Sequence, residues 1–247
     1  MQLPGQSRRS RVMRERWNGG QNATNTYRNL VSALIRPGMT VLHAGCGWDR
    51  NEITRPWRES CRIIGVDLDE RVAARFHSEF HRCSLTALPF PDAMFDLVVS
   101  EYVWEHLDDP DCAFREIART LTPGGMLVVL TPCKWSYKGL AAWLLPFRFH
   151  IWMGNLRYGR GHELDMYPTR FRCNTQRTFR MYSDKHGFAI AHINYVTNGP
   201  TWFERVPIAF VIFDWYHRAL QKHEALRQLR CAMIVLLAKT DASLRMH

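Results

Sequence analysis

A glycine pair and an aspartate have the most informative spacing in the chain. Gly45 and Gly47 follow a short apolar run, and Asp67 ends the next such run, 22 residues after Gly45. Glycine lets a backbone turn tightly and approach a ligand without interference from a Cβ atom. A carboxylate at the end of the neighbouring strand can accept hydrogen bonds from both hydroxyl groups of a ribose. The spacing therefore predicts a nucleoside-binding site.

The same loop argues against a nicotinamide dinucleotide. The dinucleotide fingerprint G-x-G-x-x-G would need a third glycine at position 50, where this chain has Arg50. The third glycine allows the close approach of helix and strand beside a pyrophosphate. NAD is therefore disfavoured as the ligand.

The segments that position these residues alternate between strand and helix. Residues 111–121 have apolar side chains at helical spacing after Pro110, and we expect Gly124 and Gly125 to end this helix and turn into a strand. Four β-branched runs are typical of buried parallel strands: 40–44, 62–67, 95–100 and 126–131. Alternation of this kind predicts an α/β fold with an open, doubly wound sheet.

The pattern changes after Thr131. Residues 132–174 are rich in aromatic side chains with basic residues between them, and we expect an insertion packed over the carboxyl edge of the sheet. The remainder predicts a helix at 175–186 that Gly187 ends, a strand at 188–196, mostly helix over 202–229 and a strand at 231–239. The last two strands lack a full helical crossover signal of the kind seen between the earlier strands, which favours an antiparallel edge.

Several motifs in this order resemble the class I S-adenosylmethionine-dependent methyltransferases, in particular the small-molecule subgroup. Besides the glycine loop and Asp67, the resemblance rests on three segments between residues 27 and 131: 88–98 (LPFPDAMFDLV), 105–110 (EHLDDP) and 121–125 (LTPGG). It implies a Rossmann-like, mostly parallel sheet of seven strands with one antiparallel edge strand. It also implies a basic N-terminal segment at 1–26 and a single methyltransferase domain at 27–247, with the acceptor-side insertion at 132–174.

The resemblance also implies roles for individual residues. Asp67 would bind the ribose, Leu68 would lie beside the adenine, and Ser84 and Leu85 would meet the adenine edge. The methionine part of S-adenosylmethionine would lie near His43, Gly45, Cys46, Gly47, Ser100 and Glu101. His43 and Ser84 stand where the family commonly has acidic residues. No metal is expected, and the product would be S-adenosylhomocysteine.

The acceptor side has weaker signals. Methyl transfer from a sulfonium needs a general base only if the acceptor loses a proton, and His106 is the candidate, with a structural role as the alternative. His150, His162 and Glu163 are further candidates. Tentative acceptor contacts are Trp135, Tyr137, His162, Tyr167 and Arg170. Two apolar stretches, 140–147 and 206–220, would form a lid over a large acceptor, contact an anionic membrane, or simply pack on the sheet.

The charge of the chain is unevenly distributed. The formal net charge is +10, from 33 Lys and Arg against 23 Asp and Glu. Residues 1–16 hold five arginines and one glutamate, and residues 134–185 hold ten basic and three acidic residues. This pattern suits an acidic acceptor, an anionic surface or simply a solvated face.

Composition and cysteine usage narrow the class of protein. Apolar residues make up 46% of the chain and nine are Trp, which excludes a disordered or collagen-like protein. Seven cysteines without a C-x-x-C pair favour a reducing, cytoplasmic setting and no zinc site. No apolar run approaches the roughly 18–20 residues of a membrane span, and we expect no secretory signal.

The sequence therefore predicts an enzyme that transfers a methyl group from S-adenosylmethionine to a small-molecule or lipid-linked acceptor, at oxygen or nitrogen. An RNA or protein methyltransferase is the alternative that the charge favours. Cys133 follows the strand predicted at 126–131, where RNA cytosine methyltransferases have a nucleophilic cysteine, but the second cysteine motif of those enzymes is missing. A catalytically inactive cofactor-binding partner protein is the other alternative. The acceptor, the atom methylated and the oligomeric state stay open.

Overall fold

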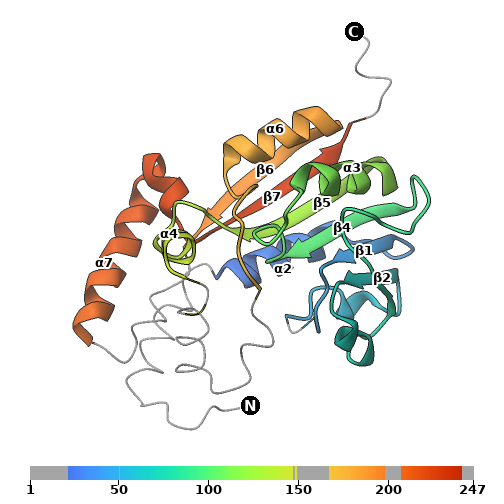
Figure 1. Cartoon of the computed structure of the whole chain (residues 1–247), viewed down its shortest axis with the longest axis horizontal. Helices are drawn as coiled ribbons and strands as arrows, with labels where there is room; N and C mark the ends of the chain where they lie inside the picture. The colour runs from blue at the N-terminus through green and yellow to red at the C-terminus, as the bar shows by residue number, and fades with distance from the viewer. Residues whose placement is uncertain (1–21, 50, 147, 149–166, 198–206, 241–247) are drawn as a thin grey trace.

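A seven-stranded sheet forms the centre of the molecule. The computed structural model describes residues 22–49, 51–146, 148, 167–197 and 207–240. The strands are β1 (Thr40–Ala44), β2 (Arg62–Asp67), β3 (Glu79–Arg82), β4 (Phe95–Glu101), β5 (Leu121–Pro132), β6 (Phe188–Val196) and β7 (Ala232–Lys239). Their spatial order is β3-β2-β1-β4-β5-β7-β6, and β7 runs antiparallel to both of its neighbours (Figure 1). The predicted doubly wound, mostly parallel sheet is confirmed, and its antiparallel strand lies next to the edge.

Helices cover both faces of this sheet. They are α2 (Ala23–Leu34), α3 (Pro110–Thr120), α4 (Tyr137–Leu144), α6 (Gln176–His186) and α7 (Pro207–Lys222), with short 3-10 turns η1 (Arg55–Trp57), η2 (Glu70–Ala74) and η5 (Glu224–Leu229). Of these, α3 and α6 pack on one face and α2 on the other. The helix α2 begins at Ala23, so the packed part of the chain starts before the expected boundary at residue 27.

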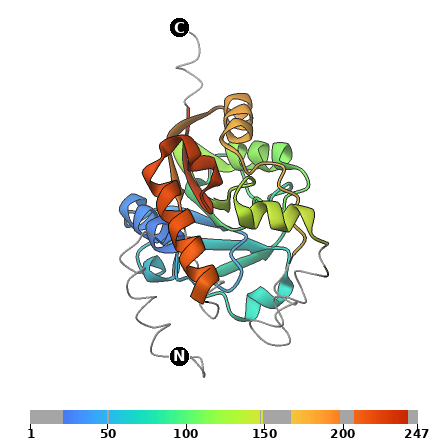
Figure 2. The same cartoon turned by 90° about the vertical axis from the view of Figure 1, so that its left-hand side faces the viewer.

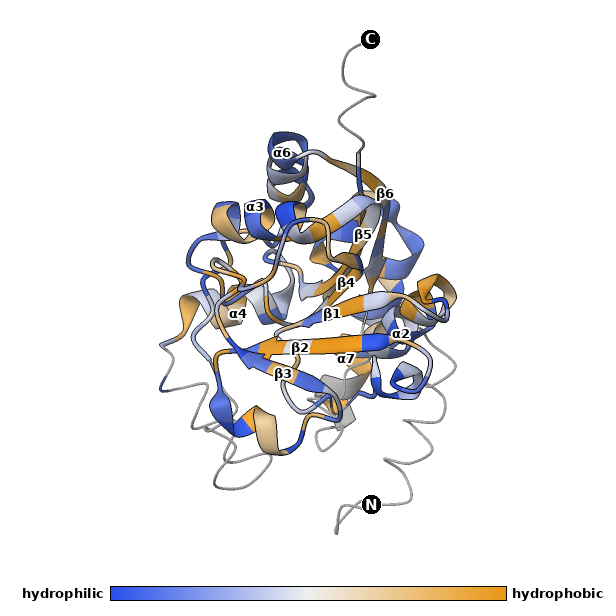
Figure 3. Cartoon of the chain, turned by 90° about the vertical axis from the view of Figure 1, so that its right-hand side faces the viewer, coloured by the Kyte–Doolittle hydropathy of each residue, from blue (hydrophilic) through white to orange (hydrophobic). Residues whose placement is uncertain are grey.

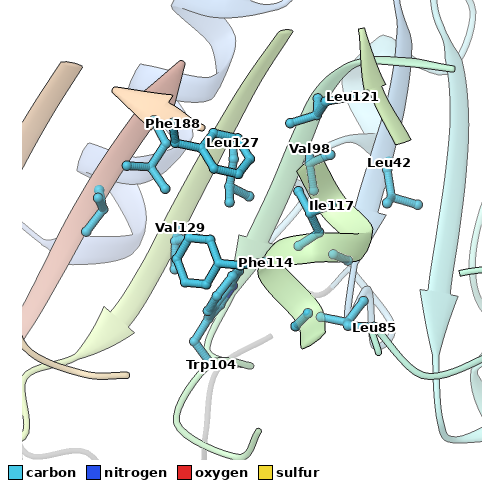
Figure 4. Packing of buried hydrophobic residues seen from close by; sticks show 14 of the residues in the cluster. Leu42, Leu85, Val98, Trp104, Phe114, Ile117, Leu121, Leu127, Val129 and Phe188 are labelled. Atoms are coloured by element: carbon cyan, nitrogen blue, oxygen red, sulfur yellow. The ribbon is translucent and has the colours of Figure 1, made fainter. Parts of the chain in front are cut away.

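Alternate strand residues supply two separate cores. Leu42 and Val98 point to the face covered by α3, where Phe114 and Ile117 meet them (Figure 4). Their neighbours Val41, Leu97 and Val99 point to the face covered by α2. Because both faces are buried, the central strands are continuous apolar runs, whereas the edge strand β3 is hydrophilic (Figure 3).

The end of α3 differs from the prediction. The helix stops at Thr120, and Leu121 is already extended and begins β5. The Thr120 hydroxyl donates to the carbonyls of Glu116 and Ile117 in the last turn. Gly124 and Gly125 therefore do not end the helix. Gly124, with a φ of 73°, lies within β5, where the pairing with β4 is irregular.

The predicted end of α6 is confirmed. The Thr175 side chain accepts from the Thr178 N–H in a capping box, and Gly187 ends the helix with a φ of 79°. The strands β6 and β7 follow the predicted segments closely, and α7 occupies part of the region predicted to be helical.

A buried tyrosine of α2 joins two central strands. The Tyr27 hydroxyl donates to the Val128 carbonyl at 3.1 Å and accepts from the Ser100 N–H at 2.8 Å. Burial raises the pKa of Tyr27 well above its usual value, so the hydroxyl keeps its proton. The contact fixes α2 across β4 and β5.

We expect Tyr27→Phe to lower the free energy of unfolding by about 1–3 kcal/mol, because the Ser100 N–H loses its partner in a buried site. Denaturant titration measures the change. Tyr195→Phe is the control, because it removes a half-buried hydroxyl that donates only to Gln176 and should have a smaller effect. Equal losses in the two variants would contradict the role given to Tyr27.

Candidate functional site

The carboxyl ends of β1, β2 and β4 meet at one edge of the sheet, where a tight loop follows β1. The N–H groups of Gly45 and Cys46 both donate to the Val66 carbonyl, at 2.8 and 3.0 Å. Gly45 has a φ of 68°, and a Cβ there would lie 2.2 Å from Val103 Cγ2. Gly47 has a φ of 48° with no atom within 4 Å of the Cβ position, so open space lies beside it. Position 45 therefore requires glycine for both conformation and space.

Asp67 is held at the end of β2 by two backbone donors. Its Oδ2 accepts from the Gly47 N–H at 2.9 Å, and its Oδ1 accepts from the Asp69 N–H at 3.0 Å. Each carboxylate oxygen can accept a further hydrogen bond. The loop thus orients a carboxylate that retains capacity for a ligand with hydroxyl groups.

A cavity of about 510 Å³ opens at this edge. Most of the residues predicted to bind the cofactor line it: His43, Gly45, Cys46, Gly47, Asp67, Leu68, Ser84, Leu85 and Glu101. Ser100 does not line the cavity. It is buried, and its Oγ has no hydrogen-bond partner among the described residues.

His43 belongs to the wall of the cavity. Its Nδ1 lies 3.1 Å from the Thr54 hydroxyl, and burial lowers its pKa to about 4. Asp49 holds the following segment, because its carboxylate accepts from the N–H groups of Ile53, Thr54 and Arg55. At neutral pH His43 is therefore uncharged and cannot replace an acidic residue electrostatically. In the sequence, only the position of Asp49, two residues after Gly47, pointed to this residue.

Glu101 joins the cavity to the N-terminal helix. Its carboxylate accepts from the Thr24 hydroxyl at 3.1 Å and from Asn51 Nδ2 at 3.0 Å. Burial raises its pKa above the usual range. The first turn of α2, the loop after β1 and the end of β4 therefore converge on one carboxylate. Nothing in the spacing of Thr24 or Asn51 predicts this.

His106 follows β4 in the chain and lines the cavity, and its hydrogen bonds define which ring nitrogen carries the proton. Its Nδ1 lies 2.9 Å from the Pro168 carbonyl, which can only accept, so Nδ1 is the donor. Its Nε2 then faces Glu105, with Oε1 at 3.8 Å. The ring therefore presents Nε2 as its basic atom.

Glu105 is a buried partner that sequence reasoning did not assign to the site. Its Oε2 accepts from the Thr131 hydroxyl at 3.2 Å, and that hydroxyl accepts from Asn174 Nδ2. Burial raises its pKa, while the proximity of His106 opposes this. Its signals in the sequence were its place in the 105–110 motif and directly before His106, whereas Thr131 and Asn174 are distant in sequence.

Of the predicted acceptor residues that the structure describes, one lines the cavity and the others do not. Tyr167 lines the cavity, with its hydroxyl 3.5 Å from Asp69 Oδ2 and its ring centroid 6.0 Å from that of His106. Arg170 pairs with Asp108 at 2.9 Å and does not line the cavity. Trp135 and Tyr137 also lie away from it, in and before α4. His150, His162 and Glu163 lie outside the described residues.

The described lining of the cavity is acidic. It contains no Lys or Arg, and five carboxylates: Asp49, Asp67, Asp69, Glu101 and Glu105. The described residues also contain no group of three or more His, Cys, Asp or Glu that could hold a metal ion. Carboxylates beside a glycine loop suit a ligand that carries hydroxyl groups and positive charge, and the sulfonium, ammonium and ribose groups of S-adenosylmethionine have these properties.

Comparisons with known proteins agree with this chemistry. Residues 42–129 match the family model described as a methyltransferase domain. A Mycolicibacterium smegmatis protein named "Probable S-adenosylmethionine-dependent methyltransferase" is 39% identical over 107 residues, which is 40% of each chain. The maize (Zea mays) phosphoethanolamine N-methyltransferase 1 is 25% identical over 47% of this chain and 25% of its own length. The matches therefore cover less than half of these relatives.

A solved structure shares the fold over a longer part of the chain. Geranyl diphosphate C-methyltransferase from Streptomyces coelicolor A3(2), in complex with geranyl diphosphate and S-adenosyl-L-homocysteine, superposes with a TM-score of 0.59 at 17% identity. The match covers 88% of this chain and 79% of that one. At this identity the likeness concerns the arrangement of strands and helices.

We expect Asp67→Ala to weaken binding of S-adenosylmethionine by on the order of 1–3 kcal/mol, about 5- to 150-fold in Kd, through lost hydrogen bonds to a charged group. Isothermal calorimetry measures the affinity. Asp92→Ala, which removes an exposed carboxylate paired with Arg119 away from the cavity, is the control. An unchanged affinity in Asp67→Ala would refute the ribose role.

A second prediction concerns the burial of Glu105. Because its folded-state pKa is raised above 4.5, its contribution to stability is complete below about pH 4.5 and is lost as the pH rises through the folded-state value. Glu105→Gln keeps the shape and stays neutral, so it should gain stability over the wild type as the pH rises. Thermal unfolding at about pH 4.5 and about pH 8.5 measures the difference.

Glu116→Gln provides the control with the opposite sign. Hydrogen bonding by Arg119 lowers the pKa of Glu116, so this carboxylate stabilises the fold above its unfolded pKa. Glu116→Gln should therefore lose stability against the wild type at the higher pH. If Glu105→Gln behaved in the same way as Glu116→Gln, the burial effect assigned to Glu105 would be wrong.

Proposed function

We propose that this chain, whose residues 42–129 match a methyltransferase domain, transfers a methyl group from S-adenosylmethionine to a small-molecule or lipid-linked acceptor, at oxygen or nitrogen. The observation that carries this proposal is the acidic cavity at the ends of β1, β2 and β4, in which the glycine loop orients Asp67. The protein would act in the cytoplasm, in peripheral contact with an anionic membrane. Among the described residues, no helix is long and apolar enough to cross a bilayer.

The residues of the cavity would hold the cofactor in two parts. Asp67 would accept hydrogen bonds from the ribose, while Leu68, Ser84 and Leu85 would surround the adenine. The loop from Gly45 to Gly47 and the Glu101 region would hold the methionine end. When bound, S-adenosylmethionine supplies an electrophilic methyl group on a sulfonium sulfur. The protein then has to orient the acceptor and exclude water.

The proton of the acceptor would go to His106. Its Nδ1 proton is held by the Pro168 carbonyl, so Nε2 is the atom free to accept a proton from an O–H or N–H group. A proton gained at Nε2 lies beside the Glu105 carboxylate, which stabilises the imidazolium ion. Glu105 is thus a positioning residue. Tyr167, whose ring centroid lies 6.0 Å from that of His106, would limit the access of water and acceptor.

The acidic lining favours a small acceptor over a nucleic acid. A polyanion would meet five carboxylates and no described Lys or Arg in the cavity. The Cys133 thiol is buried, and burial raises its pKa, so it remains protonated and is a poor nucleophile for an RNA cytosine reaction. The remaining alternative, an inactive cofactor-binding partner protein, predicts binding without transfer.

The function is tested with S-adenosylmethionine carrying a labelled methyl group. The purified protein is incubated with cell extracts that are then separated into aqueous and lipid fractions. We expect label in a product of one fraction, and less label with Asp67→Ala at a cofactor concentration near the wild-type Kd. Cofactor binding without transfer to any fraction would favour the inactive partner, and transfer to RNA alone would refute the small-molecule proposal.

We expect His106→Gln to reduce methyl transfer by about 10²–10⁴-fold while S-adenosylmethionine binding is retained, because a general base contributes about this much. Rates are compared across pH with the labelled acceptor found above. His81→Gln is the control, because His81 lies outside the cavity lining and pairs with Glu79 on β3. Unchanged transfer in His106→Gln would leave His106 a structural residue.

A further inference from the structure

One face of α7 is apolar and exposed along its length. Ile208, Val211, Ile212 and Trp215 are 77%, 64%, 59% and 71% exposed. Their spacing of i, i+3, i+4 and i+7 places all four on one side of the helix. A stripe of four large apolar side chains open to water is uncommon on a monomeric surface and indicates a binding face.

The other side of α7 holds the helix on the domain. The ring of Phe213 lies 5.2 Å and that of Tyr216 lies 6.1 Å from Tyr137 at the start of α4. His217 and Leu220, which follow on this side, are buried. The exposed stripe therefore points away from the domain, and α4 lies beside α7 on the same side of the molecule (Figure 2).

The helix α4 adds a second exposed apolar group. Trp143 and Leu144, at its C-terminal end, are 58% and 66% exposed. Lys134 Nζ lies 5.7 Å from the ring of Trp143. Tryptophan beside a cation is typical of side chains that lie at the headgroup level of a membrane.

The charge around the exposed apolar side chains of α7 and α4 distinguishes between the kinds of partner that could bind there. Within 134–146, 148 and 207–222, the described chain has one carboxylate, Asp214, which pairs with Arg218 at 2.9 Å. Four further cations lie within these ranges, so the net charge there is positive: Lys134, Lys138, Arg148 and Lys222. A second copy docking by the same face would bring together two such positive surfaces, which repel each other. A nucleic acid would match the cations but not four exposed aliphatic and aromatic side chains in a row. An anionic lipid surface matches both properties.

We propose that α7 and the end of α4 form a docking surface that inserts shallowly into an anionic phospholipid membrane. Ile208, Val211, Ile212, Trp215, Trp143 and Leu144 supply the apolar contact, and the surrounding cations attract the headgroups. The inference rests on the peripheral contact in the proposed function and assigns it to particular residues. The helix α4 follows the carboxyl end of β5 (Figure 1), and the cavity is lined at the carboxyl ends of β1, β2 and β4, so α4 lies toward the same edge of the sheet as the cavity. A lipid-linked acceptor could therefore pass from the membrane to Tyr167 and His106 along one side of the molecule.

The test is flotation of the full chain with two kinds of vesicle, phosphatidylcholine alone and phosphatidylcholine with phosphatidylglycerol. We expect binding to the anionic vesicles at about 0.1 M salt and much less at about 1 M, where charge attraction is screened within a few ångströms. Ile212→Asp should reduce the bound fraction at least tenfold, and Trp215→Ala several-fold.

The matched control is Met181→Asp, which places the same charge on an exposed apolar position of α6, away from this surface. It should bind vesicles as the wild type does. S-adenosylmethionine affinity and the melting temperature should be unchanged in all three variants, which separates this test from that of the cofactor site. Equal binding by Ile212→Asp and Met181→Asp would overturn the assignment of the surface.

Two other outcomes would also overturn the proposal. If the wild type does not float with anionic vesicles, there is no membrane contact to assign, whatever its methyl-transfer activity. If the wild type is a dimer by light scattering without vesicles and Ile212→Asp converts it to a monomer, the face binds a second copy instead.

Discussion

The hydrogen bond from the Gly47 N–H to Asp67 is the contact on which the site depends. It forms only because the loop after β1 turns back at once onto β2, with Gly45 in a left-handed conformation against Val103. The parallel pairing of β1 with β2 brings the two strand ends level, so a loop three residues long can reach the carboxylate. The register of the sheet and the need for glycine at position 45 therefore act together to fix the orientation of Asp67.

Charge is separated in this molecule between the cavity and the outer surface. The cavity gathers carboxylates, whereas α4 and α7 carry Lys138, Arg218 and Lys222 beside exposed apolar side chains. The net charge of +10 therefore says little about the cofactor, whose own positive groups suit the acidic lining. The positive charge bears instead on which partner binds the outer surface of the protein. A uniformly basic surface around a basic cavity would have favoured nucleic acid.

Features that depend on a local residue pattern could be predicted from the sequence. The strands β1 and β2 have the predicted bounds because their central residues are buried on both faces and mostly apolar. The edge strand β3 (EFHR) has no such pattern and was not predicted. The end of α3 was predicted wrongly, because the Thr120 hydroxyl, not the glycine pair, accompanies the end of the helix. The glycine loop and Asp67 were found from spacing, whereas Glu105 depends on Thr131 and Asn174, whose proximity exists only in the fold.

Residues 168–171 hold Glu105 and His106 in place at the cavity. The N–H groups of Arg170 and Phe171 both donate to the Glu105 carbonyl, and the Pro168 carbonyl accepts from His106. Phe171 has a φ of 50°, an unfavourable conformation for a bulky residue that these bonds hold in place. Residues 168–171 therefore set the His106 tautomer through the Pro168 carbonyl. In the proposed mechanism, a shift that broke this contact would free the Nδ1 proton, so acceptor binding near Tyr167 and proton transfer at His106 would be coupled through one short segment.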